Sequence, residues 1–184
     1  MTIEGFEGVL AAAQAGAEWA VAALYRELQP RVLRYLAARE PREAEDLASD
    51  VWLDVARGLG RFRGDEVGFR AWVFTIARRR LLDLNRKAAV RGRTALPPEL
   101  IGGERIAGDV EDEAIAALET ERAIARIATL PKDQADVVLL RVVADLGVAD
   151  VARIVGKRPG AVRALQLRAL RNLARTISAE AVTR

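Results

Sequence analysis

The fold is decided by one amphipathic stretch, Phe69-Arg70-Ala71-Trp72-Val73-Phe74-Thr75-Ile76-Ala77-Arg78-Arg79-Arg80-Leu81-Leu82-Asp83-Leu84-Asn85-Arg86-Lys87. Its apolar residues recur at helical spacing and predict one buried face, formed by Phe69, Trp72, Val73, Ile76, Ala77 and Leu84. The opposite side carries Thr75, Arg78, Arg79 and Arg86. Between Arg78 and Arg93, seven basic residues are set against one acid, Asp83. A helix that is apolar on one side and arginine-rich on the other is expected either to contact a polyanion or to face solvent.

A short glycine-rich loop precedes this helix and adds basic and aromatic side chains: Gly60-Arg61-Phe62-Arg63-Gly64-Asp65-Glu66-Val67-Gly68. Single-stranded nucleic acid is bound by positive grooves that follow the backbone and by aromatic rings that stack on bases. The loop and the helix together therefore predict a nucleic-acid site. The plainer alternative for Phe62 is an anchor in the apolar core.

The composition argues against enzyme chemistry. The chain has 184 residues, enough for one domain or two small ones, and it contains no cysteine and no histidine. Disulfides, the common zinc and haem ligands and histidine acid–base catalysis are therefore excluded. The two serines, Ser49 and Ser178, have no histidine to activate them. A carboxylate-only metal enzyme is left open, but no paired acids stand out, so we expect no catalytic residue, no metal and no cofactor.

The charge is segregated along the chain. The net charge is only +3, yet 26 of the 29 basic residues are arginine, the side chain suited to bidentate phosphate and guanine contacts. The first residues include Glu4 and Glu7 and no lysine or arginine, which is atypical of a secretory signal. Apolar runs stay shorter than the roughly 18 residues of a membrane span. We therefore expect a cytoplasmic protein without membrane insertion.

Helical patterns before the opening stretch run over Ile3 to Ala15, Glu18 to Arg39 with a kink at Pro30, and Arg42 to Leu59. After it, Ala88 to Asp112 is broken by Pro97-Pro98 and Gly102-Gly103 and is acidic, which is typical of a linker. All nine aromatic residues lie at or before Phe74, so the two sides of this segment have different cores. The sequence predicts an all-α protein with domains at 1–90 and 113–184, joined by a flexible acidic linker at 91–112.

The C-terminal part predicts a helix-turn-helix. Helical patterns cover Glu113 to Leu130, Pro131 to about Val143, Val148 to Val155 and Pro159 to about Ser178. The last two are separated by Gly156-Lys157-Arg158, and Val151 to Ala179 holds seven basic residues and no acid. The last helix has an expected buried face of Val162, Leu165, Ala169 and Leu173. Its candidates for a DNA groove are Arg163, Ala164, Leu167, Arg168 and Arg171.

The order of these features resembles bacterial RNA polymerase sigma factors of the extracytoplasmic-function (ECF) type. Four stretches carry the resemblance: Ala23-Leu24-Tyr25-Arg26; Ala44-Glu45-Asp46-Leu47; Arg61-Phe62-Arg63-Gly64-Asp65 through Phe69-Arg70-Ala71-Trp72 to Ile76-Ala77-Arg78; and Leu130-Pro131 through Leu139-Leu140-Arg141 to Gly160-Ala161-Val162-Arg163. It spans about residues 9 to 176. It implies a non-catalytic subunit that confers promoter specificity on core RNA polymerase.

The resemblance also implies what each part contacts. In the family, the helix that here carries Asp46, Leu47, Ser49, Asp50 and Trp52 docks on clamp helices of the largest polymerase subunit. The loop at 60–69 and the following helix open and read the minus-ten element, the helix-turn-helix reads the minus-thirty-five element, and the linker threads the active-centre cleft. The DNA-binding set expected for this chain is Arg61, Phe62, Arg63, Phe69, Arg78, Arg79, Arg86, Arg153, Lys157, Arg158, Arg163, Ala164, Leu167, Arg168 and Arg171.

Within that set the roles differ. Arg163 and Arg168 are expected to read bases in the major groove, while Arg153, Lys157, Arg158 and Arg171 bind phosphate. Arg78, Arg79 and Arg86 are expected on the upstream duplex backbone or the exposed strand, and Phe62 and Phe69 line or support the loop. The chain departs from the family pattern at Arg79, where asparagine is common, at Ser49-Asp50 in place of Gln-Glu, at Leu165 in place of a basic residue, and at Ala17 in place of a capping aspartate.

The expected partners are core RNA polymerase, promoter DNA and an anti-sigma factor that holds the two basic faces together. Two other functions stay open. A stand-alone helix-turn-helix regulator predicts a dimer that binds duplex DNA specifically without polymerase. A helical interaction protein predicts no salt-dependent affinity for nucleic acid.

Overall fold

The computed structural model describes residues 3–90 and 111–182, with side chains described for 3–90 and 118–178. Over these ranges the chain forms eight α-helices and one short 3-10 helix, and no strand, which confirms the all-α prediction. The elements are α1 (Phe6–Gln14), α2 (Glu18–Ala37), η1 (Pro41–Glu43), α3 (Ala44–Leu59), α4 (Glu66–Val90), α5 (Glu111–Ala128), α6 (Lys132–Val142), α7 (Val148–Val155) and α8 (Pro159–Val182).

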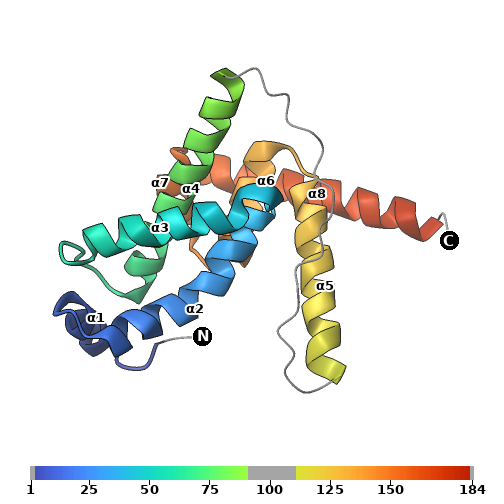
Figure 1. Ribbon diagram of the computed structural model, residues 1–184. Helices are drawn as coiled ribbons and strands as arrows, with labels where there is room; N and C mark the ends of the chain where they lie inside the picture. Colours follow the sequence, from blue (N-terminus) through green and yellow to red (C-terminus); the bar gives the residue numbers. More distant parts are fainter. Residues whose placement is uncertain (1–2, 91–110, 183–184) are drawn as a thin grey trace.

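The first four α-helices form an N-terminal half in which α2 contacts each of the other three. Helix α3 packs on both α2 and α4, and α1 packs on α2 (Figure 1). Aromatic rings fill the space between these helices: Phe69 lies 5.8 Å from Phe6 between ring centroids, and Phe74 lies 5.6 Å from Tyr35. Such contacts bury large apolar areas, so they fix α4 against α1 and α2.

Helices α3 and α4 approach closely because of Gly58. A Cβ atom at this position would lie 2.6 Å from Cζ2 of Trp72, closer than non-bonded carbons can come. The absence of a side chain therefore lets the Trp72 ring lie against α3. This approach positions the arginines of α4 beside the acids of α3.

Helix α4 differs from the prediction at both ends. It begins at Glu66 rather than Phe69, because Asp65 caps it: the Asp65 carboxylate accepts a hydrogen bond from Gly68 N at 2.7 Å, and its backbone carbonyl accepts one from Phe69 N at 2.9 Å. It ends at Val90, inside the segment expected to be linker, and α5 begins at Glu111. Residues 91–110 of the predicted linker lie outside the described residues.

The C-terminal half is formed by α5 to α8. Helix α6 contacts α5, α7 and α8, and α7 also packs on α8. The core is aliphatic, as the sequence predicts, and includes Leu139, Leu140, Leu146 and Val162, all nearly inaccessible to solvent. Gly156 ends α7 in the left-handed region (φ 68°), a backbone conformation that glycine adopts without a steric penalty. This turn sets the angle between α7 and α8.

The two halves touch each other. Helix α4 of the N-terminal half packs beside α7 of the C-terminal half (Figure 1). The long helix α8 lies in the C-terminal half and leads to the end of the chain (Figure 1). The polar contacts at this interface involve one of the arginines expected to bind DNA.

Candidate nucleic-acid interface

Helix α8 has the two faces that its sequence predicts. Val162 and Ala169 are fully buried and Leu165 is 8% exposed, so they face the core of the C-terminal half. The burial of Leu165 gives a physical reason for an apolar residue at this position. The five groove candidates are all exposed: Arg163, Ala164, Leu167, Arg168 and Arg171.

The turn before α8 adds further positive charge near the N-terminal end of that helix. Ala149, Ala152, Arg153, Gly156, Lys157, Arg158 and Pro159 line a shallow hollow there. Arg153 pairs with Asp150 on its own helix, and Lys157 Nζ lies 2.9 Å from Asp133 Oδ2. All three basic side chains are exposed or largely so, which means that their intramolecular partners do not remove them from solvent. A phosphate can therefore reach them.

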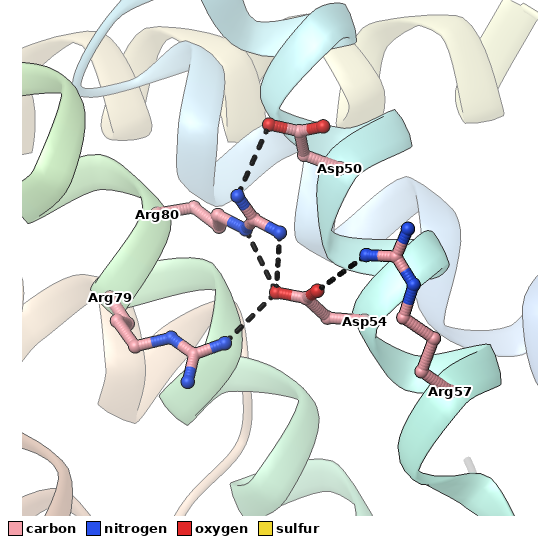
Figure 2. Close-up of polar contacts among 5 residues, drawn as sticks. All are labelled: Asp50, Asp54, Arg57, Arg79 and Arg80. Carbon is pink, nitrogen blue, oxygen red and sulfur yellow. Dashed lines mark hydrogen bonds and ion pairs between the residues drawn. The ribbon is translucent and has the colours of Figure 1, made fainter.

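On the N-terminal half, Asp54 of α3 is the common acceptor for three arginines (Figure 2). Its Oδ2 lies 2.9 Å from Arg79 Nη2 and 2.7 Å from Arg80 Nη2, and Arg80 Nε donates to the same oxygen at 2.8 Å. Its Oδ1 accepts from Arg57 Nη1 at 3.4 Å. Arg80 also reaches Asp50 Oδ2 at 3.5 Å. These contacts join the helix expected to dock on polymerase to the helix expected to bind DNA.

The charge state of Asp54 follows from these contacts. Burial alone would raise the pKa of this carboxyl, but the hydrogen bonds and charges of Arg80 and Arg79 outweigh it and hold the pKa below its ordinary value. Asp54 is therefore ionised at neutral pH. Neither Asp54 nor Arg80 belongs to the predicted binding sets, because their contact joins residues 26 positions apart on two helices.

The helical pattern predicts that Arg78 lies on an open surface, but the structure shows that it does not. Its side chain is only 17% exposed, and its Nε donates to Asp136 Oδ2 of α6 at 3.2 Å. Its Nη1 also donates to the carbonyl oxygen of Ile154, near the end of α7, at 3.3 Å. The pattern gave the wrong exposure because these acceptors lie 58 and 76 residues further along the chain.

Asp136 also forms an ion pair with a second arginine at this interface. Arg39 Nε lies 3.3 Å from Asp136 Oδ1, and both side chains are almost buried. Burial, together with the negative charge of Asp136, raises the pKa of the neighbouring Tyr35 hydroxyl. A further ion pair joins the halves, from Arg70 Nη1 to Asp145 Oδ2 at 3.6 Å. The interface is thus held by arginines of the N-terminal half and carboxylates of the C-terminal half.

The aromatic loop residues are packed together. Phe62 is half-buried, stacked on Trp72 at 5.2 Å and edge-on to Phe69 at 5.3 Å. Phe69 is 1% exposed, so it can support the loop but cannot present its ring to a base. Arg61 and Arg63 are exposed, and Arg63 Nη1 donates to the carbonyl oxygens of Gly60 and Phe62. Arg86 is exposed beside Asp83, at 3.1 Å.

The residues expected to dock on polymerase divide by burial. Asp46 and Ser49 are exposed, Asp50 and Trp52 are half-buried, and Leu47 is 6% exposed and belongs to the core. Trp52 Nε1 donates to Gln29 Oε1 at 2.6 Å, and its ring lies 4.8 Å from that of Tyr25.

Helices α2 and α3 also carry exposed apolar side chains, those of Trp19, Val21, Tyr25 and Leu53. Trp19 has the largest exposed fraction of these four, at 61%.

The described ranges also bear on metal binding and on membrane insertion. No group of three or more aspartates or glutamates there could hold a metal ion. No described helix combines the length and apolar character needed to cross a bilayer.

The fold and these basic surfaces define an all-helical transcription protein with a helix-turn-helix in its C-terminal half. Comparison with known proteins agrees: residues 24–91 match sigma-70 region 2, and residues 120–173 match sigma-70 region 4. The chain is 35% identical over 183 residues to the ECF RNA polymerase sigma factor SigD of Mycobacterium tuberculosis, covering 94% of this chain and 85% of SigD.

Two further proteins extend the comparison. The ECF RNA polymerase sigma factor BldN of Streptomyces coelicolor is 33% identical over 171 residues, which is 92% of this chain but 64% of BldN. The solved complex of the sigma factor RpoE with the anti-sigma factor NepR from Bartonella quintana contains a chain with the same fold. It has a TM-score of 0.64 and 19% identity, and the match covers 85% of this chain and 97% of that one.

The chain belongs to the ECF family of RNA polymerase sigma factors. It is a transcription initiation factor that confers promoter specificity, as the sequence resemblance predicts.

Proposed function

We propose that this chain reads promoters through two separate surfaces while it is bound to core RNA polymerase. The observation that carries the proposal is the exposed face of α8, where Arg163, Arg168 and Arg171 project from a helix whose other face is buried. An α-helix fits the major groove, and arginine recognises guanine there through two hydrogen bonds.

In the minus-thirty-five region, Arg163 and Arg168 contact base edges, and Ala164 and Leu167 lie against the groove. Arg153, Lys157, Arg158 and Arg171 bind phosphates and fix the register of the helix on the duplex. The exposure of these side chains supports this division.

In the minus-ten region, Arg79 and Arg86 of α4 contact the upstream duplex backbone or the exposed strand, together with Arg61 and Arg63 of the loop. Phe62 and Phe69 support the loop. Opening the duplex costs a few kcal/mol per base that leaves the stack, and phosphate contacts and a base pocket offset that cost. Arg78 joins this surface only when it leaves Asp136.

The docking surface for core polymerase is the exposed side of α3, with Asp46, Ser49, Asp50 and Trp52. Leu47 contributes by holding α3 in the bundle. The exposed Tyr25 of α2, whose ring packs against Trp52, extends this surface. We also propose the domain limits 1–90 and 113–184, the cytoplasm as the site of action, an anti-sigma factor as a regulatory partner, and no catalytic activity of the chain itself.

In-vitro transcription with purified core polymerase on a promoter library tests the proposal. The expected result is sequence-specific initiation that disappears when this chain is omitted. Specific binding of duplex DNA by a dimer of this chain without polymerase would instead support a stand-alone regulator. Absence of both activities would support an interaction protein.

A further inference from the structure

We propose that Asp54 is a positioning residue: it fixes the guanidinium of Arg79, so that base preference in the minus-ten region depends on a carboxylate that does not touch DNA. This inference rests on the proposed function of α4, in the alternative in which Arg79 contacts bases of the exposed strand rather than the duplex backbone. Asp54 lies on α3 and Arg79 on α4, so the contact joins two helices whose separation is already fixed by Gly58 and Trp72.

The exposures of the two side chains suit them to these roles. The side chain of Asp54 is 12% exposed, whereas that of Arg79 is 62% exposed. One terminal nitrogen of Arg79 is used by Asp54, and most of the guanidinium faces solvent. A long side chain loses rotamer freedom when it binds a ligand. Arg79 has already lost part of its rotamer freedom on folding, so that part is not lost again on binding. The contact with Asp54 also gives the guanidinium plane a preferred orientation.

Asp54 is itself held in place by Arg80. Two nitrogens of Arg80 contact the same Asp54 oxygen, at 2.7 and 2.8 Å, and the Arg80 side chain is only 28% exposed. Figure 2 shows Arg80 between the carboxylates of Asp50 and Asp54. Because Arg80 anchors the carboxylate, Asp54 does not turn to follow Arg79.

The cluster keeps a surplus of positive charge. Two carboxylates, Asp50 and Asp54, face three guanidinium groups, those of Arg57, Arg79 and Arg80, which leaves a net charge of +1. Asp54 therefore orients Arg79 without cancelling the attraction of this surface for an anion. An oriented arginine can discriminate between bases, because a bidentate contact requires a defined guanidinium plane.

The test uses the chain bound to core polymerase, on a promoter library in which each position of the minus-ten element carries each base. Arg79→Ala, Asp54→Asn and the double variant are compared with the unsubstituted chain. Both single variants should reduce preference at the same position by about threefold to tenfold, and the double variant should lose no more than Arg79→Ala alone. Asp54→Glu should restore most of the preference.

Two results would overturn the inference. One is an Asp54→Asn variant that initiates less on every promoter by the same factor, as expected of a purely structural residue. The other is a double variant in which the two losses multiply. Arg57→Ala is the matched control, since Arg57 is 72% exposed and contacts the same carboxylate at 3.4 Å; it should leave base preference unchanged.

A measurement on the unsubstituted chain covers the case in which Asp54→Asn does not fold. Side-chain nitrogen NMR of the free protein should show restricted rotation for the Arg79 guanidinium, as for Arg80 and unlike Arg57. An Arg79 side chain as mobile as Arg57 contradicts the inference. Failure of the unsubstituted chain to initiate anywhere contradicts the proposed function instead, so the two failures are distinguishable.

Discussion

At the scale of the residue, the proposed function divides α8 into base-reading and phosphate-binding arginines. Arg163→Ala should reduce discrimination at one position of the minus-thirty-five element by about 1–3 kcal/mol, because a bidentate guanine contact is lost. Initiation on matched and substituted elements measures the effect. Arg158→Ala is the comparison: it should weaken all sequences alike and reduce the salt slope by about 0.9. Unchanged discrimination in Arg163→Ala means that this residue does not read a base.

Asp54 also makes the stability of the N-terminal half depend on pH. Its folded pKa lies below the unfolded value of about 3.9, so its contribution is present above that pH and is lost as the pH falls through the folded pKa. Asp54→Asn should therefore lower the melting temperature clearly at pH 7 and much less at an acid pH below the folded pKa. Thermal unfolding at both pH values measures this. An equal loss at both would contradict the ion pairing, and Asp83→Asn, in an exposed pair, should have little effect at either.

The sequence could predict residues whose role depends on their own helix. The exposed and buried faces of α8 follow from helical periodicity, as with Arg163 and Leu165. It could not predict the partners of Arg78 or Arg79, because Asp136 lies 58 residues away from one and Asp54 lies 25 residues away from the other. Those contacts depend on how helices and halves come together.

At the scale of the element, periodicity predicted every α-helix but not all of their limits. The start of α4 was placed three residues late because Asp65 was assigned to the loop, whereas its carboxylate caps the helix. Helix α4 also continues to Val90. Its charged and apolar pattern extends to that point, but the glycine- and proline-rich segment beyond it makes the end of the helix hard to recognise in the sequence. The ends of a helix depend on local hydrogen bonds, including those of capping residues, and a 3.6-residue periodicity does not reveal them.

The turn of the helix-turn-helix provides a test at this scale. Gly156→Ala should destabilise the C-terminal half by about 1–2 kcal/mol, because a Cβ is unfavourable at its positive φ. Gly160→Ala, in the first turn of α8 and with open space at its Cβ, should instead stabilise by about 0.4–1 kcal/mol. Urea unfolding of both variants measures the difference. Equal effects would mean that the turn tolerates a side chain.

At the scale of the whole molecule, the contact between the two halves depends on Asp136. Replacing Asp136 with asparagine leaves Arg39 and Arg78 without a charged partner at an almost buried site, a change that typically costs about 3–5 kcal/mol. Asp136→Asn should therefore increase the radius of gyration measured by small-angle X-ray scattering. Asp145→Asn is the control, because Asp145 is 69% exposed and its removal should change little. An unchanged radius for Asp136→Asn would show that apolar packing alone holds the halves together.

The same contact limits how far the protein can reach. Elements centred roughly 25 base pairs apart are separated by about 85 Å of duplex, at 3.4 Å per base pair. While α4 and α7 lie side by side, the two halves of the protein are too close together to reach two DNA elements that far apart. The twenty residues 91–110 can span at most about 70 Å when fully extended, and the dimensions of the two halves supply the remainder. If the chain reads both elements at once, as we propose, α4 and α7 have to separate, and binding to polymerase and DNA has to supply the energy of that separation.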